Sequence, residues 1–281
     1  MRRIALFFQY ALPHRLLSRL IYYIMRIRVG FIKNFIIKRM VSAFSIRLDE
    51  AESADINDYP HFNAFFTRAL KPGIRPIDEQ KAHIVSPVDG AISQAARIEN
   101  GRIIQAKDHS YTVAELLAVE QAPEELMNGH FMTIYLSPKD YHRIHAPIDC
   151  QLQHMQHVPG RLFSVAEWTA QSIPRLFARN ERLVNTLSTD MGSVYSVYVG
   201  AILVSSIETV NQGLITPPYA NRVREVPMQD TEQFNKGDEM ARFNMGSTVI
   251  LLFPENSIEL ADHIKPGVSV KLGEKIAVKK A

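Results

Sequence analysis

Hydrophobic residues in the first 48 positions occur in short clusters that are separated by single cations. The apolar stretch 4–12 is closed by Pro13, and two arginines bracket the next apolar run, 20–25. A helix that crosses a membrane needs about 20 largely apolar residues, and no uncharged run here approaches that length. Bulky apolar side chains among evenly spaced Arg and Lys are typical of helices that lie in the plane of a membrane surface. We therefore predict basic amphipathic helices over residues 1–48.

The pattern changes after this segment to short β-type runs that are broken by Gly, Pro and Asp. The segments 59–68 and 112–120 are predicted to be short helices, the first with an aromatic face. The clearest predicted strands lie within 131–136, 194–210 and 249–253, and two Gly-punctuated pieces, 265–270 and 272–277, indicate hairpins. The predicted fold class is α+β, with N-terminal helices followed by a β-rich, mainly antiparallel domain over residues 49–281.

Charge is distributed unevenly along the 281 residues. Residues 1–48 carry ten Lys or Arg and no acid, so the net charge of +3 leaves −7 for the rest of the chain. These cations alternate with bulky hydrophobics, which favours an anionic membrane surface over nucleic acid as the partner. The alternative is a basic helix pair packed on its own domain. No export signal is visible, so the expected location is peripheral, on the cytoplasmic side of the cell membrane.

Histidines and the single cysteine are candidates for carrying chemistry. Five of the ten histidines fall between positions 130 and 157: His130, His142, His145, His154 and His157. The pairs 142/145 and 154/157 have the spacing His-x-x-His. Residues three apart on a strand face opposite sides, and neither pair encloses the Glu of a zinc protease. The sequence therefore predicts no metal site. Cys150 excludes an internal disulfide, suits a reducing compartment, and is predicted to be buried and inert.

Three polar segments stand beside predicted strands and are candidates for a site. Asp89 lies in a Ser-Pro-Val-Asp-Gly turn, where its ordinary role would be to cap the turn. His142 and His145 follow the strand 131–136 after a short turn. Gly246 and Ser247 lead into an apolar strand, and Gly leaves its carbonyl sterically open to attack. The pair alone is a weak signal, because Gly-Ser recurs at 192–193.

The flanks of the Gly-Ser pair carry a resemblance to a known family. Residues 236–249, Lys-Gly-Asp-Glu-Met-Ala-Arg-Phe-Asn-Met-Gly-Ser-Thr-Val, resemble the processing segment of bacterial pyruvoyl-dependent phosphatidylserine decarboxylases, which usually ends Leu-Gly-Ser-Thr. Met245 replaces the commoner Leu and Ala241 a frequent Gly, and the scissile pair is intact. Further matches follow in the family's order at 62–68, 75–78, 86–90, 136–145, 158–165, 176–182 and 199–201. The resemblance thus covers nearly all of residues 59–253.

The resemblance implies two successive reactions. Asp89, His145 and Ser247 would form a charge relay that cuts the chain between Gly246 and Ser247 and converts Ser247 into a covalent pyruvoyl group, the cofactor. The large chain 1–246 and the small chain 247–281 would stay together, and the pair could dimerise further. The pyruvoyl carbonyl would then form a Schiff base with phosphatidylserine and yield phosphatidylethanolamine and CO2 in phospholipid biosynthesis. His142 is implied in carboxylate handling or protonation.

Two other classes of protein remain as alternatives. A membrane-associated serine hydrolase could use Asp89, His145 and Ser247, because chain order does not distinguish triads. Against it, Ser247 lacks a Gly-x-Ser-x-Gly elbow and precedes a strand rather than a helix. A biotinyl or lipoyl carrier domain would need a modifiable Lys at a hairpin tip, which the sequence does not offer.

Overall fold

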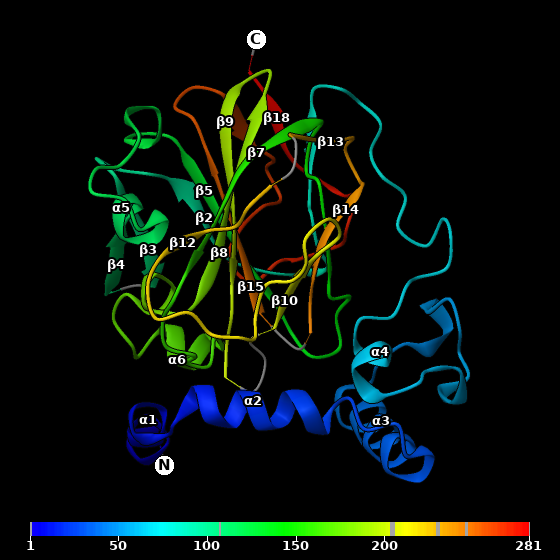
Figure 1. Ribbon diagram of the computed structural model, residues 1–281. Coiled ribbons are helices and arrows are strands. Elements are labelled where there is room, and N and C mark those ends of the chain that lie inside the picture. Colours follow the sequence, from blue (N-terminus) through cyan, green and yellow to red (C-terminus); the bar gives the residue numbers. More distant parts are fainter. Residues whose placement is uncertain (1, 107, 203–205, 229–230, 245–246, 281) are drawn as a thin grey trace.

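The computed structural model describes residues 2–106, 108–202, 206–228, 231–244 and 247–280. The N-terminal segment forms the helices α1 (Arg2–Ala11), α2 (His14–Ile24) and α3 (Gly30–Phe44). They lie beneath one end of a β-rich body (Figure 1). Within the described ranges, every helix is too short or too polar to cross a membrane. The strand pairing in the sheets is antiparallel, which confirms the predicted α+β class.

A nine-stranded sheet forms the centre of the body, with β15 (Ser247–Phe253) in its middle. Every residue of β15 is buried, because strands flank both of its edges and cores cover both of its faces. In sheet order the strands are β12 (Arg224–Glu225), β7 (Cys150–Val158), β8 (Arg182–Thr189), β9 (Gly192–Val199), β15, β5 (His130–Leu136), β2 (Gly90–Arg97) and β17 (Ser269–Val270), and β13 (Glu232–Phe234) also pairs with β7.

A four-stranded sheet shares a core with one face of the large sheet. Its strands are β11 (Gly213–Leu214), β10 (Ile207–Thr209), β14 (Glu239–Phe243) and β6 (Arg143–His145). Ile144 and Phe243 from this sheet belong to the same hydrophobic cluster as Val249 and Leu251 of β15. Side chains alternate along a strand, so Ser247 lies on the same face as Val249 and points towards the four-stranded sheet.

The opposite face of the large sheet is covered by short elements. Ile250 and Leu252 pack there with Phe163 and Phe177. The covering elements are β3 (Arg102–Ala106), β4 (His109–Thr112), α5 (Val113–Leu117), α6 (Glu167–Ala170) and α7 (Leu176–Arg179). A third sheet joins β1 (His83–Val85), β18 (Lys275–Lys279) and β16 (Ile258–Leu260), and 3-10 turns occur at η1 (Leu48–Glu50), η2 (Ile56–Asp58) and η3 (Glu124–Leu126).

A separate small core attaches α3 to the body, whereas Tyr10 of α1 and His14 of α2 pack edge-on against Phe163. Ile37 of α3 clusters with Phe62, Phe65 and Phe66 of α4 (Phe62–Phe66). The backbone nitrogen of Asn63 also donates to the Met25 carbonyl at 2.9 Å. The helical segment 1–48 therefore packs against residues that follow it, and α4 connects it to the β-rich domain.

Several predicted elements differ from the structure in extent or pairing. The helix expected over 59–68 is limited to α4, and the run 194–210 is divided between β9 and β10. The two tail pieces do not form local hairpins. Instead β17 pairs with β2, and β18 pairs with β1 and β16. Glycine turns mark where a strand ends, but the choice of a distant partner depends on tertiary packing.

Candidate active site

Three segments that are distant in sequence meet at the end of the large sheet nearest the helices (Figure 1). Ser247, the first residue of β15, pairs with Leu136, the last residue of β5. Gly90 begins β2 at the same level, where an added Cβ would lie 2.6 Å from the Tyr135 carbonyl oxygen. Only glycine permits so close an approach. The turn containing Asp89, the segment after Leu136 and the start of β15 are therefore neighbours.

Ser247 is fully buried, and its hydroxyl has no hydrogen-bond partner among the described residues. The segment before it is held at Asn244, whose side-chain oxygen accepts from the Asn63 amide at 2.8 Å. The Asn244 amide donates to the Ser206 hydroxyl at 3.0 Å. Gly246, the other half of the predicted cleavage site, lies outside the described residues. The predicted nucleophile is thus buried and unbonded, and the chain three residues before it is firmly anchored.

His145 has the protonation pattern of a general base. Its Nδ1 lies 2.7 Å from the Gly237 carbonyl oxygen, and its Nε2 lies 3.1 Å from the Tyr141 hydroxyl. A carbonyl can only accept, so Nδ1 carries the proton and Nε2 accepts from Tyr141. Burial lowers the pKa of His145 more than the bond to Gly237 raises it. The ring is therefore neutral, with its lone pair on Nε2.

Asp89 is buried and ionised. Burial by itself raises the pKa of its carboxyl, but the hydrogen bonds from Arg75 and from the Leu272 amide outweigh burial and lower it. Arg75 donates from Nε at 2.9 Å and from Nη2 at 2.7 Å, and its Nη2 also contacts Glu50 at 2.6 Å.

The predicted contact between Asp89 and His145 is not formed within the part of the chain that the structure describes. Both side chains are hydrogen-bonded to other residues. The carboxylate of Asp89 accepts from Arg75, and both nitrogens of His145 are bonded to Tyr141 and Gly237. Their backbones are close, since the His145 nitrogen donates to the Pro87 carbonyl at 2.9 Å. The role of Asp89 in processing stays a prediction.

His142 is fully buried beside this group. Its ring stacks on Phe66 with the centroids 4.1 Å apart. Neither ring nitrogen has a well-formed hydrogen bond to a described residue, although the Ser137 backbone lies close by. Burial, helped by the charge of Arg68, lowers the pKa of His142 to about 3. The ring is neutral at physiological pH, so one nitrogen can donate a hydrogen bond and the other can accept one.

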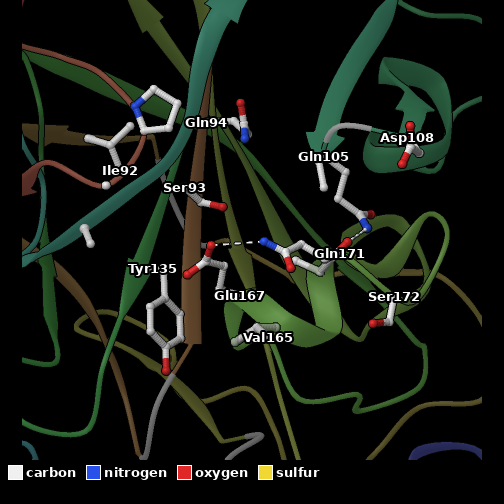
Figure 2. A pocket seen from close by; sticks show the side chains of 15 residues that line it. Ile92, Ser93, Gln94, Gln105, Asp108, Tyr135, Val165, Glu167, Gln171 and Ser172 are labelled. Carbon is white, nitrogen blue, oxygen red and sulfur yellow. Dashed lines mark hydrogen bonds between the residues drawn. The ribbon is translucent and has the colours of Figure 1, made fainter. Parts of the chain in front are cut away.

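A cavity of about 750 Å³ lies on the other face of the large sheet. Glu167 and Gln171, joined by a hydrogen bond of 3.0 Å, line it together with Ser93 and Tyr135, which lie beside Glu167 in Figure 2. Tyr135 pairs with Thr248 in the sheet. Because side chains alternate, this cavity and the Ser247 hydroxyl lie on opposite faces of β15.

Comparison with known proteins decides the family. A family model described as phosphatidylserine decarboxylase matches residues 62–278, and a second model, described as PSD, matches residues 4–45. The chain belongs to the phosphatidylserine decarboxylase family. The family resemblance and the enzyme class predicted from the sequence are thereby confirmed.

Curated relatives match the chain over nearly its whole length. A protein of Ectopseudomonas mendocina is 46% identical over 281 residues, which cover 97% of each chain. One from Pseudomonas fluorescens is 46% identical, with 97% of this chain and 96% of the relative covered. One from Stutzerimonas stutzeri is 47% identical, with 95% and 92% covered. Each is named phosphatidylserine decarboxylase proenzyme.

The other candidate residues lie away from this group. His157 is fully buried with Nε2 2.7 Å from Glu181 Oε1, whereas His154 is partly exposed beside Glu225. Among the described residues, no three His, Cys, Asp or Glu side chains gather closely enough to hold a metal ion. Burial raises the pKa of the Cys150 thiol to about 12, which makes it a poor nucleophile.

Sequence reasoning missed several residues that the structure places at the site of this family member. Arg75 holds Asp89, Tyr141 bonds to His145, and Asn63 holds Asn244. The signal for all three was present, because Asn63, Arg75 and Tyr141 lie in segments that match the family. Spacing along the chain could not show which side chains they contact.

Proposed function

We propose that the protein is made as a precursor, cuts its own chain between Gly246 and Ser247, and decarboxylates phosphatidylserine to phosphatidylethanolamine with a pyruvoyl group made from Ser247. The observation that carries this proposal is the buried, unbonded hydroxyl at the first residue of the central strand. An unbonded hydroxyl in a protein interior is costly, by about 1–3 kcal/mol, and calls for a functional reason. The name proenzyme, given to the relatives, supports processing.

In the proposed cleavage, His145 acts as the base. Nε2 must first release the Tyr141 hydroxyl, after which it accepts the proton of the Ser247 hydroxyl. The oxygen attacks the Gly246 carbonyl carbon, the C–N bond breaks as the nitrogen takes the proton back, and an ester replaces the amide. Loss of the Cα proton of residue 247 then breaks the Cβ–O bond and frees the carboxylate of Gly246. Water replaces the nitrogen of the resulting dehydroalanine, and ammonia leaves.

The residues around position 247 fit a covalent pyruvoyl group. Conversion removes the hydroxyl that has no described partner, so the site loses an unsatisfied donor rather than a bonded one. When present, the group supplies a carbonyl that accepts the electron pair released with CO2. His142 lies nearby as a neutral ring with open nitrogens, suited to holding or delivering a proton at the reacting carbon.

The sheet pairing accounts for two chains that remain together after cleavage. β15 would belong to the small chain 247–281, yet it pairs with β5 and β9 of the large chain 1–246. The strands β17 and β18 of the small chain pair with β2 and β1 of the large one. Separating the chains would expose the fully buried β15 and both of its cores, so we propose a stable two-chain protomer.

We also propose that the helices α1–α3 rest on an anionic membrane surface on the cytoplasmic side. They carry large apolar side chains that are more than one-third exposed, together with the basic residues noted above. These side chains are Ile4, Phe7, Phe8, Tyr10, Leu16, Leu20, Tyr23, Phe31, Phe35 and Phe44. The helices lie at the same end of the body as the start of β15 (Figure 1), so a lipid headgroup would meet the site from this side.

Carboxyl-labelled phosphatidylserine in anionic vesicles tests the proposal. We expect released CO2 to rise in parallel with the fraction of protein that runs as two chains on denaturing electrophoresis. A serine hydrolase would remain one chain and release no CO2. Uncut protein that decarboxylates at the full rate would contradict the proposal.

A further inference from the structure

Arg68, just after α4, is a buried arginine with open donors. Its residue is 4% exposed. Nη2 donates to the Lys139 carbonyl at 3.3 Å, and within the described ranges Nε and Nη1 have no hydrogen-bond partner. Buried charged groups are ordinarily paired and hydrogen-bonded, because leaving them unbonded in the interior is costly.

Arg182 shows how this fold can satisfy a buried arginine with backbone hydrogen bonds. It is 2% exposed, and each of its three guanidinium nitrogens donates to a backbone carbonyl. The acceptors, at 2.6 to 2.8 Å, are the carbonyls of Leu116, Ala178, Asn180 and Glu115. Arg68 has the same burial without these bonds, so its guanidinium is left ready for a ligand.

The position of Arg68 identifies the reaction site as the place where that ligand binds. Lys139, its carbonyl partner, lies in the segment that leads from Leu136, opposite Ser247, to His142. Phe66, two residues before Arg68, stacks on His142, and the charge of Arg68 acts on that ring. Arg68 and His142 are therefore neighbours, and with Ser247 they are three buried side chains with unbonded polar atoms at this end of the large sheet.

No neighbouring carboxylate takes up the open donors of Arg68. Asp89, Glu50 and Asp140 all exert an attractive charge on it, and Glu50 accepts a hydrogen bond from Arg75 at 2.6 Å. Asp89 is bonded to Arg75 and the Leu272 amide, and Asp140 accepts from the Ser137 nitrogen at 2.7 Å. The arginine thus remains a cationic fork with two free nitrogens, a geometry that matches the oxygens of a phosphate.

We propose that Arg68 binds the phosphodiester of the phosphatidylserine headgroup, an assignment that rests on the proposed function. The substrate carboxylate is the poorer partner, because it becomes neutral CO2. A cation bound to it would stabilise the substrate more than the transition state and slow the reaction. The phosphodiester keeps its charge throughout, so Arg68 can hold the headgroup without opposing loss of CO2.

The test compares two substrates in Arg68→Met protein. One is phosphatidylserine, and the other is an ether lipid that joins the serine oxygen to the same hydrocarbon body without phosphate. For phosphatidylserine we expect kcat/KM per cleaved molecule to fall about 10- to 100-fold, the effect of losing charge-assisted hydrogen bonds. For the phosphate-free lipid we expect less than about a threefold change, because the lost bonds are not made to it.

Arg68→Lys and Arg182→Met serve as matched controls. Arg68→Lys keeps the charge without the fork and should lose less activity on phosphatidylserine than Arg68→Met; it also decides the comparison if Arg68→Met is not cleaved. Arg182→Met should lower thermal stability and affect both substrates equally. An equal loss on both substrates in the Arg68 variants, or loss of cleavage in both, would overturn the assignment. Wild-type protein that releases no CO2 would instead contradict the proposed function itself.

Discussion

Two sets of buried polar side chains behave differently in this molecule, although the core under α5–α7 also holds the unbonded hydroxyl of Tyr111. Under the helices α5–α7, Gln105 and Asn180 use all of their hydrogen-bonding groups on backbone atoms of the covering segments. Gln105 bonds to Ala170, Ile173 and Leu176 at 2.7 to 2.8 Å, and Asn180 bonds to Phe163 and Gly200 at 2.9 to 3.0 Å. At the start of β15, Ser247, His142 and Arg68 are equally buried but have open donors or acceptors.

We interpret this difference as a division between side chains that stabilise the fold and side chains that serve the reaction. Bonded polar groups hold the covering segments onto the sheet, and each hydrogen bond contributes about 1 kcal/mol. Unbonded groups cost a similar amount, and such groups are expected where a protein needs them for a reaction. Substitutions in the first region should therefore change stability, whereas substitutions in the second should change the reaction and leave stability nearly unaltered.

The largest effect is expected for Ser247→Ala. Removal of the hydroxyl should abolish the two-chain product and all decarboxylation, since no nucleophile remains. The urea midpoint of unfolding of the variant should equal that of the uncut wild-type precursor. Electrophoresis and CO2 release measure this. Ser193→Ala is the control, because Ser193 also follows a glycine but lies in β9 away from the site; it should be cut and active. Cleavage of the Ser247→Ala chain would contradict the role of the unbonded Ser247 hydroxyl in the reaction.

A nearly complete loss is expected for His145→Ala. Self-cleavage should slow by about 10²- to 10⁴-fold, the usual contribution of a general base, as measured by the conversion of freshly synthesised precursor. The lowered pKa of His145 means that its base form persists below the ordinary titration range of histidine. Wild-type cleavage should therefore stay constant from pH 8 to about 6.5 and fall only at lower pH. Full cleavage of the variant would remove His145 from the mechanism.

Asp89→Asn tests whether the carboxylate of Asp89 assists His145 in cleavage. If the ionised carboxylate assists His145, the amide should slow cleavage, and by less than His145→Ala because the base is still present. Precursor conversion is again the measurement. An unchanged rate of cleavage would show that the hydrogen bonds between Asp89 and Arg75 contribute to stability alone, like those of Gln105 and Asn180.

His142→Ala should separate the two reactions. The variant should be cut into two chains, yet its kcat for phosphatidylserine should fall by about 10²-fold, because proton handling at the substrate is lost. His154→Ala, at a partly exposed position on β7, is the matched control and should behave as wild type. Normal turnover by cleaved His142→Ala protein would show that an unbonded buried histidine here is only structural.

The smallest effect on the reaction is expected for Asn180→Ala. It removes three hydrogen bonds and should lower the free energy of unfolding by about 3 kcal/mol, measured by urea titration. Activity per cleaved molecule should change less than twofold, since Asn180 bonds only to backbone groups. A selective loss of kcat without loss of stability would contradict the division between the two regions.

The sequence predicted the secondary-structure elements better than the tertiary contacts between them. Periodicity and turn residues located the strands near β5 and β15, and the family resemblance named Asp89, His142, His145 and Ser247. It could not show that Arg68 lies beside His142, because the two are distant in sequence and meet only when α4 packs onto the sheet end.

The bonding partners of Asp89 and His145 were also beyond prediction. The carboxylate is held by Arg75 and the imidazole by Tyr141 and Gly237. These contacts depend on register and side-chain direction, which spacing along a chain does not encode.

Intact mass spectrometry of the purified wild-type protein tests the central claim most directly. We predict two components, residues 1–246 and residues 247–281, with the smaller one lighter by one ammonia than the same peptide beginning with serine. A fully active protein with the mass of the unbroken chain, or a small chain that still begins with serine, would contradict the account.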